Sequence, residues 1–456
     1  MQDQADTTAR LLQGSLVAGE VTALADSDGS RARLGDVGLE ARVPGGVPGD
    51  RGQFRVTHVG KNAAWARIHE LETPSPHRVE PPCPLVERCG GCPWQMASLE
   101  IQRQTRSETL HALLDPHCPD ATWREDPGPR VETGYRTRAL MMTRRIDGRL
   151  ELGFYGPGTN DLVPVERCVV QHPELDRALQ HARAILDRSG LTTWDGPDRP
   201  GTLRALLLRF DPAVGRGLLT IVASREEPKL LEIARDLLAI PGIVGVFANI
   251  NPSDSGPVLG RDTIELGGAT RQRVTFGGLA LEVGPTAFLQ TNHQVAQAMV
   301  ATVGSLMPAR MEHLADLYAG IGVFGLSLKD RAARVTLAEV AADACADARG
   351  NTAHLGTRNV TVVEGPLATT IGRALTAATD AVIVDPPRRG LDSAVLDALV
   401  APSGPRRLVY VSCGPRSLAR DLAQLVAAGY QVTDVVPLDM FPHTPHVEVI
   451  VAASRS

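Results

Sequence analysis

Two residues near the C-terminus could together carry out covalent catalysis. Cys413 follows an apolar run in "VSCGP", and Glu448 stands at the start of another in "HVEVI". A thiolate is a strong nucleophile, and a carboxylate can act as a general base. A thiolate that adds to C6 of a pyrimidine makes C5 nucleophilic enough to accept a methyl group. In this chemistry Cys413 would be the nucleophile, and Glu448 would remove the C5 proton so that the thiolate can leave.

A glycine-rich stretch could hold a nucleoside-containing cofactor. "AGIGVFG" contains the G-x-G-x-x-G pattern of dinucleotide sites at Gly320, Gly322 and Gly325. Glu339 follows Gly320 by 19 residues, where a carboxylate can accept both ribose hydroxyls. The pattern suits a nicotinamide or flavin dinucleotide and S-adenosylmethionine alike, so the elements around it must decide between them.

A group of cysteines has the spacing of metal ligands. "CPLVERCGGCPWQ" places Cys83, Cys89 and Cys92 within ten residues. Zinc ribbons pair one C-x2-C with a second, and this chain has no second pair. A cubane iron–sulfur cluster takes one loop plus a remote cysteine. We therefore favour a [4Fe-4S] cluster over zinc, with Cys168 as the remote ligand rather than Cys118, which is expected in a polar loop.

The order of apolar runs predicts the fold that positions these residues. Five β-type runs alternate with helical stretches, as in a parallel doubly wound sheet; they end at Tyr318, Val340, Glu364, Asp385 and Cys413. The last two runs, 430–439 and 446–454, are too close for a crossover helix and must pair antiparallel. This is an S-adenosylmethionine-dependent methyltransferase architecture rather than a dinucleotide fold. Parallel strands present ligand-facing residues at their carboxyl ends, so Cys413, Glu448 and "DPPRRGL" should converge there.

The first 285 residues show less regular patterns. Short β-like runs and Gly/Pro turns over 14–70 predict a small β-barrel, and a proline-rich linker follows it. Residues 94–115 have helical spacing. Within 127–285, "GRLELGFYG", "TLRALLLRFD" and "GLLTIVAS" are strand-like, whereas "PELDRALQHARAILDRSG" and "EPKLLEIARDLLAI" are helical. We expect a barrel domain at 1–75, a central α+β iron–sulfur domain at 76–285 and a methyltransferase domain at 286–456, with helix 94–115 able to pack on the last.

Composition sets outer limits on the function. The chain has 456 residues, of which 43% are hydrophobic and 22% charged, with a net charge of −5. No apolar run reaches the length of a membrane helix, and no secretion signal is visible. We read the seven cysteines as reduced and expect a cytoplasmic monomer with no membrane contact. Residues 130–149 contain six arginines and only two acidic residues, so this stretch could contact RNA phosphates.

These motifs resemble the RNA uracil-5-methyltransferase family, in the branch with an N-terminal TRAM barrel and a [4Fe-4S] cluster. "PGGVPGD", "CPLVERCGGCPWQ", "FLQTN", "DLYAGIG", "DPPRRG", "SCGP" and "HVE" are similar to its motifs. The resemblance implies that Gln290 contacts cofactor and base, and that Tyr318 packs on S-adenosylmethionine with Gly320 and Gly322. It also implies that Glu339 binds the ribose and that Asp385 lies between cofactor and uracil.

The resemblance implies an RNA substrate, with 23S ribosomal RNA favoured over transfer RNA. Two departures stand out. Gly414 replaces the family's usual asparagine after the nucleophile, and "EGPL" has Gly365 and Pro366 where the family often places a polar residue against the adenine. Methylation of cytosine or of an exocyclic amine is an alternative, although Arg388 replaces the aromatic residue of amine methylases. An RNA-binding iron–sulfur protein with an inactive methyltransferase domain is another, and an oxidoreductase comes last.

Overall fold

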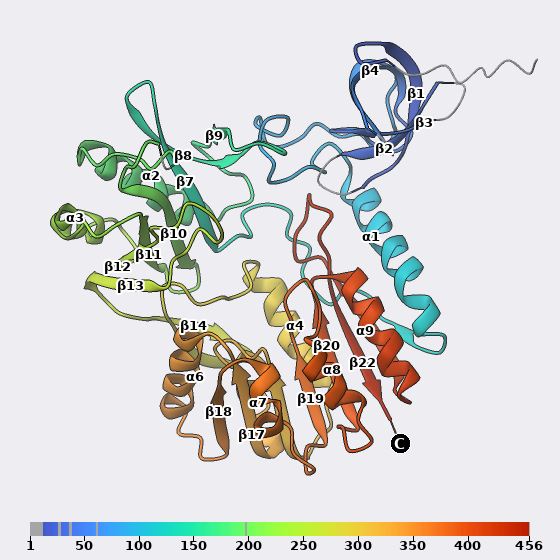
Figure 1. Cartoon of the computed structure of the whole chain (residues 1–456), viewed down its shortest axis with the longest axis vertical. Helices are drawn as coiled ribbons and strands as arrows, with labels where there is room; N and C mark the ends of the chain where they lie inside the picture. The colour runs from blue at the N-terminus through green and yellow to red at the C-terminus, as the bar shows by residue number, and fades with distance from the viewer. Residues whose placement is uncertain (1–11, 26–28, 36–38, 61–62, 197, 456) are drawn as a thin grey trace, which may run out of the picture. The chain divides into compact units, whose positions relative to one another are not determined.

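The computed structural model describes residues 12–25, 29–35, 39–60, 63–196 and 198–455. The chain divides into two compact units (Figure 1). The first comprises Met1–Thr109, Phe154–Val165 and Phe441–His446, and the second comprises Leu110–Gly153, Glu166–Met440 and Val447–Ser456. Each of the two units therefore contains segments that are distant in sequence.

The first unit contains a closed β-barrel, as the sequence pattern predicts. Its strands follow the order β1-β2-β3-β5-β4, and only β3 and β5 are parallel. The strands are β1 (Leu16–Ala23), β2 (Ser30–Leu34), β3 (Leu39–Val43), β4 (Arg51–Val59) and β5 (Ala64–Thr73). Alternate residues point inward, and Val21, Leu34 and Phe54 are fully buried inside. A five-stranded barrel of this size is filled by its own side chains.

The "PGGVPGD" segment forms a turn that is held by one buried carboxylate. Asp50 accepts hydrogen bonds from the backbone N–H of Val47 at 2.7 Å and of Ser75 at 2.9 Å. It also pairs with the guanidinium of Arg78. The turn is therefore tied to the chain that leaves the barrel. The rest of this unit includes most of α1 (Leu99–Leu114) and the short β9 (Leu162–Pro164).

The second unit contains a mostly antiparallel sheet with strands in the order β13-β12-β11-β10-β7-β8. Its elements are β7 (Arg138–Ile146), β8 (Arg149–Tyr155), α2 (Pro173–Arg188), β10 (Leu203–Asp211), β11 (Arg216–Ala223), α3 (Pro228–Leu238), β12 (Ile243–Ile250) and β13 (Asp262–Gly268). A hairpin of β14 (Gln272–Phe276) and β15 (Leu279–Val283) follows. The apolar pattern indicated β8, α2, β10, β11 and α3 but not β12 to β15.

The C-terminal sheet has the predicted arrangement. Its strands run in the order β18-β17-β16-β19-β20-β22-β21-β6, and the first five are parallel. The strands of this sheet other than β6 are β16 (Met311–Leu317), β17 (Ala332–Glu339), β18 (Val360–Glu364), β19 (Ala381–Val384), β20 (Arg407–Ser412), β21 (Gln431–Leu438) and β22 (Glu448–Ser454). β22 pairs antiparallel with both β20 and β21. The predicted terminal hairpin is therefore confirmed, and a two-residue strand, β6 (Thr122–Trp123), extends its edge.

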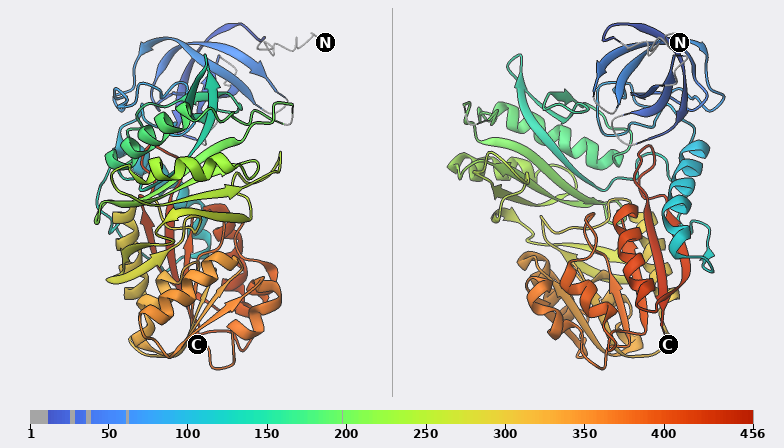
Figure 2. Two further views of the ribbon diagram at one scale, coloured as in Figure 1. Left: turned by 90° about the vertical axis from the view of Figure 1, so that its left-hand side faces the viewer. Right: turned by 45° about the vertical axis from the view of Figure 1, so that its right-hand side comes forward.

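Helices lie on both faces of this sheet (Figures 1 and 2). They are α4 (His293–Leu306), α5 (Val323–Ser327), α6 (Ala342–His354), α7 (Leu367–Ala374), α8 (Ser393–Val400) and α9 (Pro415–Ala427); two 3-10 turns, η1 (Asp115–His117) and η2 (Lys329–Arg331), complete the elements. α7, α8 and α9 cover one core, to which the last turns of α1 add Leu110 and Leu114. Cys118 lies in the loop after a helix, as predicted, but its side chain is buried in that core.

Among the described residues, no helix is long and apolar enough to cross a membrane.

Candidate active site

Cys413 and Glu448 lie next to each other at the carboxyl edge of the parallel strands. Cys413 follows β20 directly, and Glu448 is the first residue of β22. The register of the two strands pairs Ser412 with Val449, so the residues on either side of this pair are neighbours across the sheet. Because β22 lies between β20 and β21, Glu448 is not a charge on an exposed edge strand.

Glu448 is a buried carboxyl group whose surroundings favour its protonated form. Its side chain is 2% exposed, and its Oε2 atom has no hydrogen-bond partner among the described residues. Burial raises its pKa well above the usual value, and the nearby charge of Asp385 raises it further, whereas Arg388 lowers it. Once it is ionised, a carboxylate with a raised pKa is a stronger base than one in water.

The thiol of Cys413 is protonated at neutral pH in this form of the protein. Burial raises its pKa to about 11, with smaller contributions from the charges of Glu448 and Asp385 and an opposing one from Arg388. A thiol must lose its proton before it can attack carbon. Bound cationic groups or a base are therefore needed to generate the nucleophile.

Gly414 allows the loop after the nucleophile to pack closely on the "DPPRRG" segment. A Cβ atom at this position would lie 2.6 Å from the carbonyl oxygen of Arg388 and 2.7 Å from the hydroxyl of Ser417. Ser417 donates to the Arg388 carbonyl at 2.8 Å, and the Gly414 N–H donates to Ser412 Oγ at 3.1 Å. The departure from the family pattern thus coincides with a loop held by other hydrogen bonds.

The glycine-rich loop after β16 has the strained backbone of a close ligand approach. Gly320 and Gly322 have φ values of 56° and 89°, and Tyr318 is one of three non-glycine residues with positive φ in the described chain. The Tyr318 hydroxyl accepts a hydrogen bond from the N–H of Asp392 at 3.1 Å. This bond ties the loop to the segment after β19.

Glu339 already orders the backbone around this loop. Its Oε2 accepts from the N–H of Gly320 at 2.9 Å, and its Oε1 accepts from Val340 and Ala341 at 2.7 Å and 2.8 Å. The side chain is partly exposed, and each carboxylate oxygen has a second lone pair. Glu339 can therefore accept further hydrogen bonds from a ribose without losing these contacts.

Two aspartates beneath the loop share an unusual environment. Asp316 is fully buried; its Oδ2 accepts from the Gly325 N–H at 2.7 Å, and its Oδ1 has no partner among the described residues. Burial raises the pKa of Asp316 to about 7, with smaller contributions from Asp385 and Glu339. Asp385 is only partly accessible, and burial raises its pKa to about 7 as well. Both carboxyl groups favour a cationic ligand close by.

A pocket of about 520 Å³ joins these features. Tyr318, Gly320 and Asp385 line one side, and Phe288 and Gln290 approach it from the chain before α4. Gln290 Oε1 is buried without a partner among the described residues, so a ligand group could satisfy it. The remaining wall is apolar and includes Ala296, Met299 and Val300 of α4 together with Phe276. The predicted site residues did not include these four, although the apolar spacing of 293–306 was visible.

The cysteine loop in the first unit consists largely of turns. Cys83, Cys89 and Cys92 are partly exposed and form no disulfide. Cys168 belongs to the second unit, where burial raises its pKa. Within the part of the chain that the structure describes, no three His, Cys, Asp or Glu side chains are grouped as metal ligands. The side chains as placed do not form a preorganised metal site.

The arginine-rich stretch is partly occupied by structural contacts. Arg145 donates to Asp187 Oδ1 at 2.9 Å and to three backbone carbonyls. Arg144 forms an ion pair with Asp195 at 3.5 Å, whereas Arg149 is exposed. The prediction that Arg144 and Arg145 hold RNA phosphates therefore needs a test that separates binding from folding.

Known proteins match the chain over its full length. The family model for tRNA (uracil-5-)-methyltransferase matches residues 278–456. An uncharacterized RNA methyltransferase of Gloeobacter violaceus is 33% identical over 98% of both chains, and one of Bacillus cereus is 31% identical over 91% of both. The chain belongs to the RNA uracil-5-methyltransferase family. The chain is thus an RNA methyltransferase that uses S-adenosylmethionine.

A solved structure shares the fold of this chain. The Pyrococcus abyssi tRNA (uracil-54, C5)-methyltransferase, in complex with S-adenosyl-L-homocysteine, superposes with a TM-score of 0.76. The two chains are 24% identical, and the match covers 96% of this chain and 99% of the other. The pocket described above has the donors, acceptors and apolar wall that a nucleoside with a methionine portion requires.

Proposed function

We propose that this protein methylates C5 of a specific uridine through a covalent adduct between Cys413 and C6 of the base. The observation that carries the proposal is the buried, unpartnered Glu448 Oε2 beside a cysteine at the sheet edge. A structural role for either residue does not explain why a carboxyl group is buried without a hydrogen bond. A general base explains this burial, because its partner is the C5 proton of the substrate and is present only when RNA is bound.

The proposed reaction proceeds in steps in which each bond that forms is matched by one that breaks. The thiolate of Cys413 bonds to C6, and the electron pair of the C5–C6 double bond moves into the ring carbonyl as an enolate. C5 of the enolate then attacks the methyl group of S-adenosylmethionine; the methyl–sulfur bond breaks, its electron pair stays on sulfur, and S-adenosylhomocysteine leaves. Glu448 then takes the C5 proton, the double bond re-forms, and the Cys413 thiolate leaves.

The cofactor positions predicted from the sequence fit the same scheme. Gln290 lines the pocket from the chain that precedes α4, and its amide could bond to both cofactor and base. Tyr318, Gly320 and Gly322 would hold the methionine portion, and Glu339 would hold the ribose. Asp385 would lie at the junction of cofactor and uracil, where its charge raises the pKa values of both Cys413 and Glu448.

Two substitutions test the chemistry because they should stop it at different steps. Cys413→Ala should still bind RNA and S-adenosylmethionine but form neither product nor adduct. Glu448→Gln keeps the nucleophile and should transfer the methyl group, after which the C5 proton has no base. The expected result is a methylated RNA–protein complex that migrates slowly on a denaturing gel. Full turnover by Cys413→Ala would refute the covalent mechanism and favour amine methylation.

The RNA class is a separate part of the proposal. We infer 23S ribosomal RNA from the resemblance to the branch with barrel and cysteine loop. Transfer RNA is the second candidate, because the solved neighbour acts on uridine 54 of tRNA. Mass-spectrometric mapping of 5-methyluridine in both RNAs, with and without the gene, decides between them. Loss of the modification from tRNA alone would overturn the ribosomal assignment.

The cluster is proposed on the cysteine spacing alone. Cys83, Cys89, Cys92 and Cys168 form no disulfide, and cysteines that ligate a cluster as thiolates must be reduced. We derive no catalytic step through the cluster, because these side chains are not grouped as metal ligands. Anaerobically purified protein should contain about four irons per chain. Colourless protein with one equivalent of zinc, or with no metal, would contradict the assignment.

A further inference from the structure

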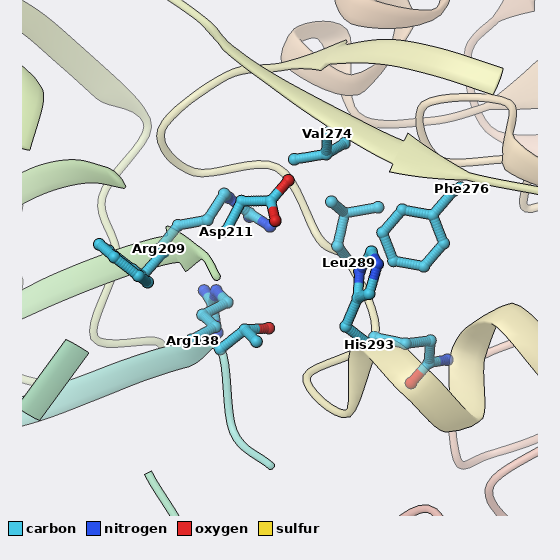
Figure 3. Close-up of a pocket in the computed structure, with 10 residues that line it drawn as sticks. Arg138, Arg209, Asp211, Val274, Phe276, Leu289 and His293 are labelled. Atoms are coloured by element: carbon cyan, nitrogen blue, oxygen red, sulfur yellow. The ribbon is translucent and has the colours of Figure 1, made fainter. Parts of the chain in front are cut away.

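A second cavity adjoins the cofactor pocket and has no role in the chemistry above. The empty space among its lining atoms is roughly 290 Å³, including space that is open to solvent. The cavity lies between the central sheet, the β14 strand and the start of α4 (Figure 3). It shares Phe276, Leu289 and Gln290 with the cofactor pocket. A ligand in this cavity would therefore lie beside the residue that is proposed to contact both cofactor and uracil.

The central sheet contributes three charged side chains to this cavity. They are Arg138 from β7 and Arg209 and Asp211 from β10, which is an inner strand of the sheet. Arg209 and Asp211 are each only 4% exposed. The Nε atoms of both arginines and Oδ2 of Asp211 have no hydrogen-bond partner among the described residues. Buried polar atoms without partners are rare in folded proteins and indicate a missing ligand.

The two arginines create a local excess of positive charge. Arg209 donates to the carbonyl oxygen of Ala287, but neither guanidinium forms an ion pair with a carboxylate of the described chain. Burial, with a smaller contribution from the positive charge of Arg138, lowers the pKa of Arg209 to about 9. A bound anion would stabilise both charged guanidinium groups and so offset the lost hydration and their mutual repulsion. A phosphate can accept the paired N–H groups of a guanidinium.

The facing wall suits a planar, hydrogen-bonding ring. Phe276 and His293 present rings whose centroids are 4.6 Å apart, and Figure 3 shows them opposite Asp211 and Arg138. Burial lowers the pKa of His293, so its imidazole is neutral at pH 7. The free Oδ2 of Asp211 can accept an N–H group, such as those on the edges of nucleobases. Phosphate and base together describe one nucleotide.

We propose that this cavity binds a nucleotide that neighbours the target uridine in the same RNA strand, with its phosphate on Arg138 and Arg209 and its base edge on Asp211. The proposal rests on RNA methylation and adds a second point of sequence recognition to it. Sequence-specific proteins read RNA through unstacked bases in loops, and the target of this enzyme must itself leave its stack. Its neighbour is then free to enter an adjoining cavity.

The test measures RNA binding, so it does not depend on catalysis. Five-nucleotide RNAs with a central uridine are titrated in the presence of S-adenosylhomocysteine, with each flanking base removed in turn. For the wild type, removal of one particular base should weaken binding roughly five- to hundredfold, as loss of a bound base does. In Asp211→Asn the same removal should have little effect, because the contact is already lost. The other abasic positions should behave alike in both proteins.

Arg209→Gln and a matched control complete the experiment. Arg209→Gln should reduce the slope of binding against salt by about one phosphate contact, whereas Arg216→Gln, an exposed arginine on β11, should not. Asp211→Ser provides a second variant if Asp211→Asn fails to fold, and S-adenosylhomocysteine binding verifies folding. The proposal would be overturned if Asp211→Asn weakened the binding of all RNAs equally, or if removal of no single base weakened RNA binding by the wild type. Absence of methylation with the binding pattern intact would instead refute the proposed chemistry alone.

Discussion

Substitution of Asp316 by asparagine should remove a large pH dependence from the stability of the methyltransferase sheet. Asp316 is fully buried at the end of β16, and its pKa rises from 3.8 to about 7. The folded protein thus retains a proton that the unfolded chain releases between about pH 4 and pH 7. Stability must therefore fall as pH rises through this window and level off above it. Three pKa units correspond to about 4 kcal/mol.

Asparagine keeps the size of the side chain and an oxygen that can accept from Gly325, but it does not titrate. Its amide nitrogen would replace an unpartnered oxygen, and a buried donor without a partner costs about 1–3 kcal/mol. This cost is the same at every pH. The difference in stability between pH 5 and pH 8 therefore isolates the carboxyl group, whatever the net effect of the substitution.

Hydrogen exchange of β16 and β17 peptides in increasing urea measures this difference, because the two-unit chain is not expected to unfold in one step. The variant should lose about 3 kcal/mol less than the wild type between pH 5 and pH 8, because the part of the effect between pH 4 and pH 5 lies outside this window. Asp385 contributes a pH dependence of the same sign that remains in both proteins. Asp397→Asn, on the exposed side of α8, is the control. An unchanged pH slope in Asp316→Asn would show that the carboxyl group is ionised in the folded protein.

Three further predictions concern the active-site loop and the arginine-rich strand. Gly414→Asn restores the family's residue but should destabilise the protein by about 1–3 kcal/mol through overpacking, lowering both its melting temperature and its activity; higher activity would contradict this. Alkylation of Cys413 by iodoacetamide should accelerate about tenfold per pH unit from pH 7 to pH 10, because its pKa is about 11, and Glu448→Gln should shift the profile to lower pH. Arg145→Glu should lower the melting temperature, whereas Arg149→Glu should leave it unchanged and flatten the salt dependence of RNA binding. Equal melting temperatures would show that the Arg145 contacts are not structural.

The sequence predicts the methyltransferase sheet well because its strands are nearly continuous apolar runs separated by helices. Buried parallel strands have this pattern, and six residues between the last two runs exclude a crossover. The same reasoning fails for β12 to β15, where short strands contain glycine and polar residues whose pairing is set by distant neighbours. It also fails for Cys118, which lies in a polar segment but is buried because the turn after α1 points it into the core.

Some site residues could be predicted from the sequence and others could not, for the same reason. Cys413, Glu448, Asp385 and the glycine-rich loop could be predicted because they occur at strand ends, where backbone topology alone brings them together. Arg209 and Asp211 could not, because both lie within an apolar strand that reads as core, "LRALLLRFD". Only the fold shows that alternate residues of this strand face a cavity.

The charges of the site are arranged for a substrate that brings charge of its own. Asp316, Asp385 and Glu448 are acids whose pKa values rise on burial, next to a pocket for a cationic methyl donor. Positive charge brought next to the aspartates favours their ionised forms, and it also lowers the pKa of the Cys413 thiol. The cavity beyond Gln290 has an excess of positive charge instead, since Arg138 and Arg209 form no ion pair with a carboxylate among the described residues. Cofactor and RNA would thus each neutralise one side, which leads us to expect that either ligand strengthens the binding of the other.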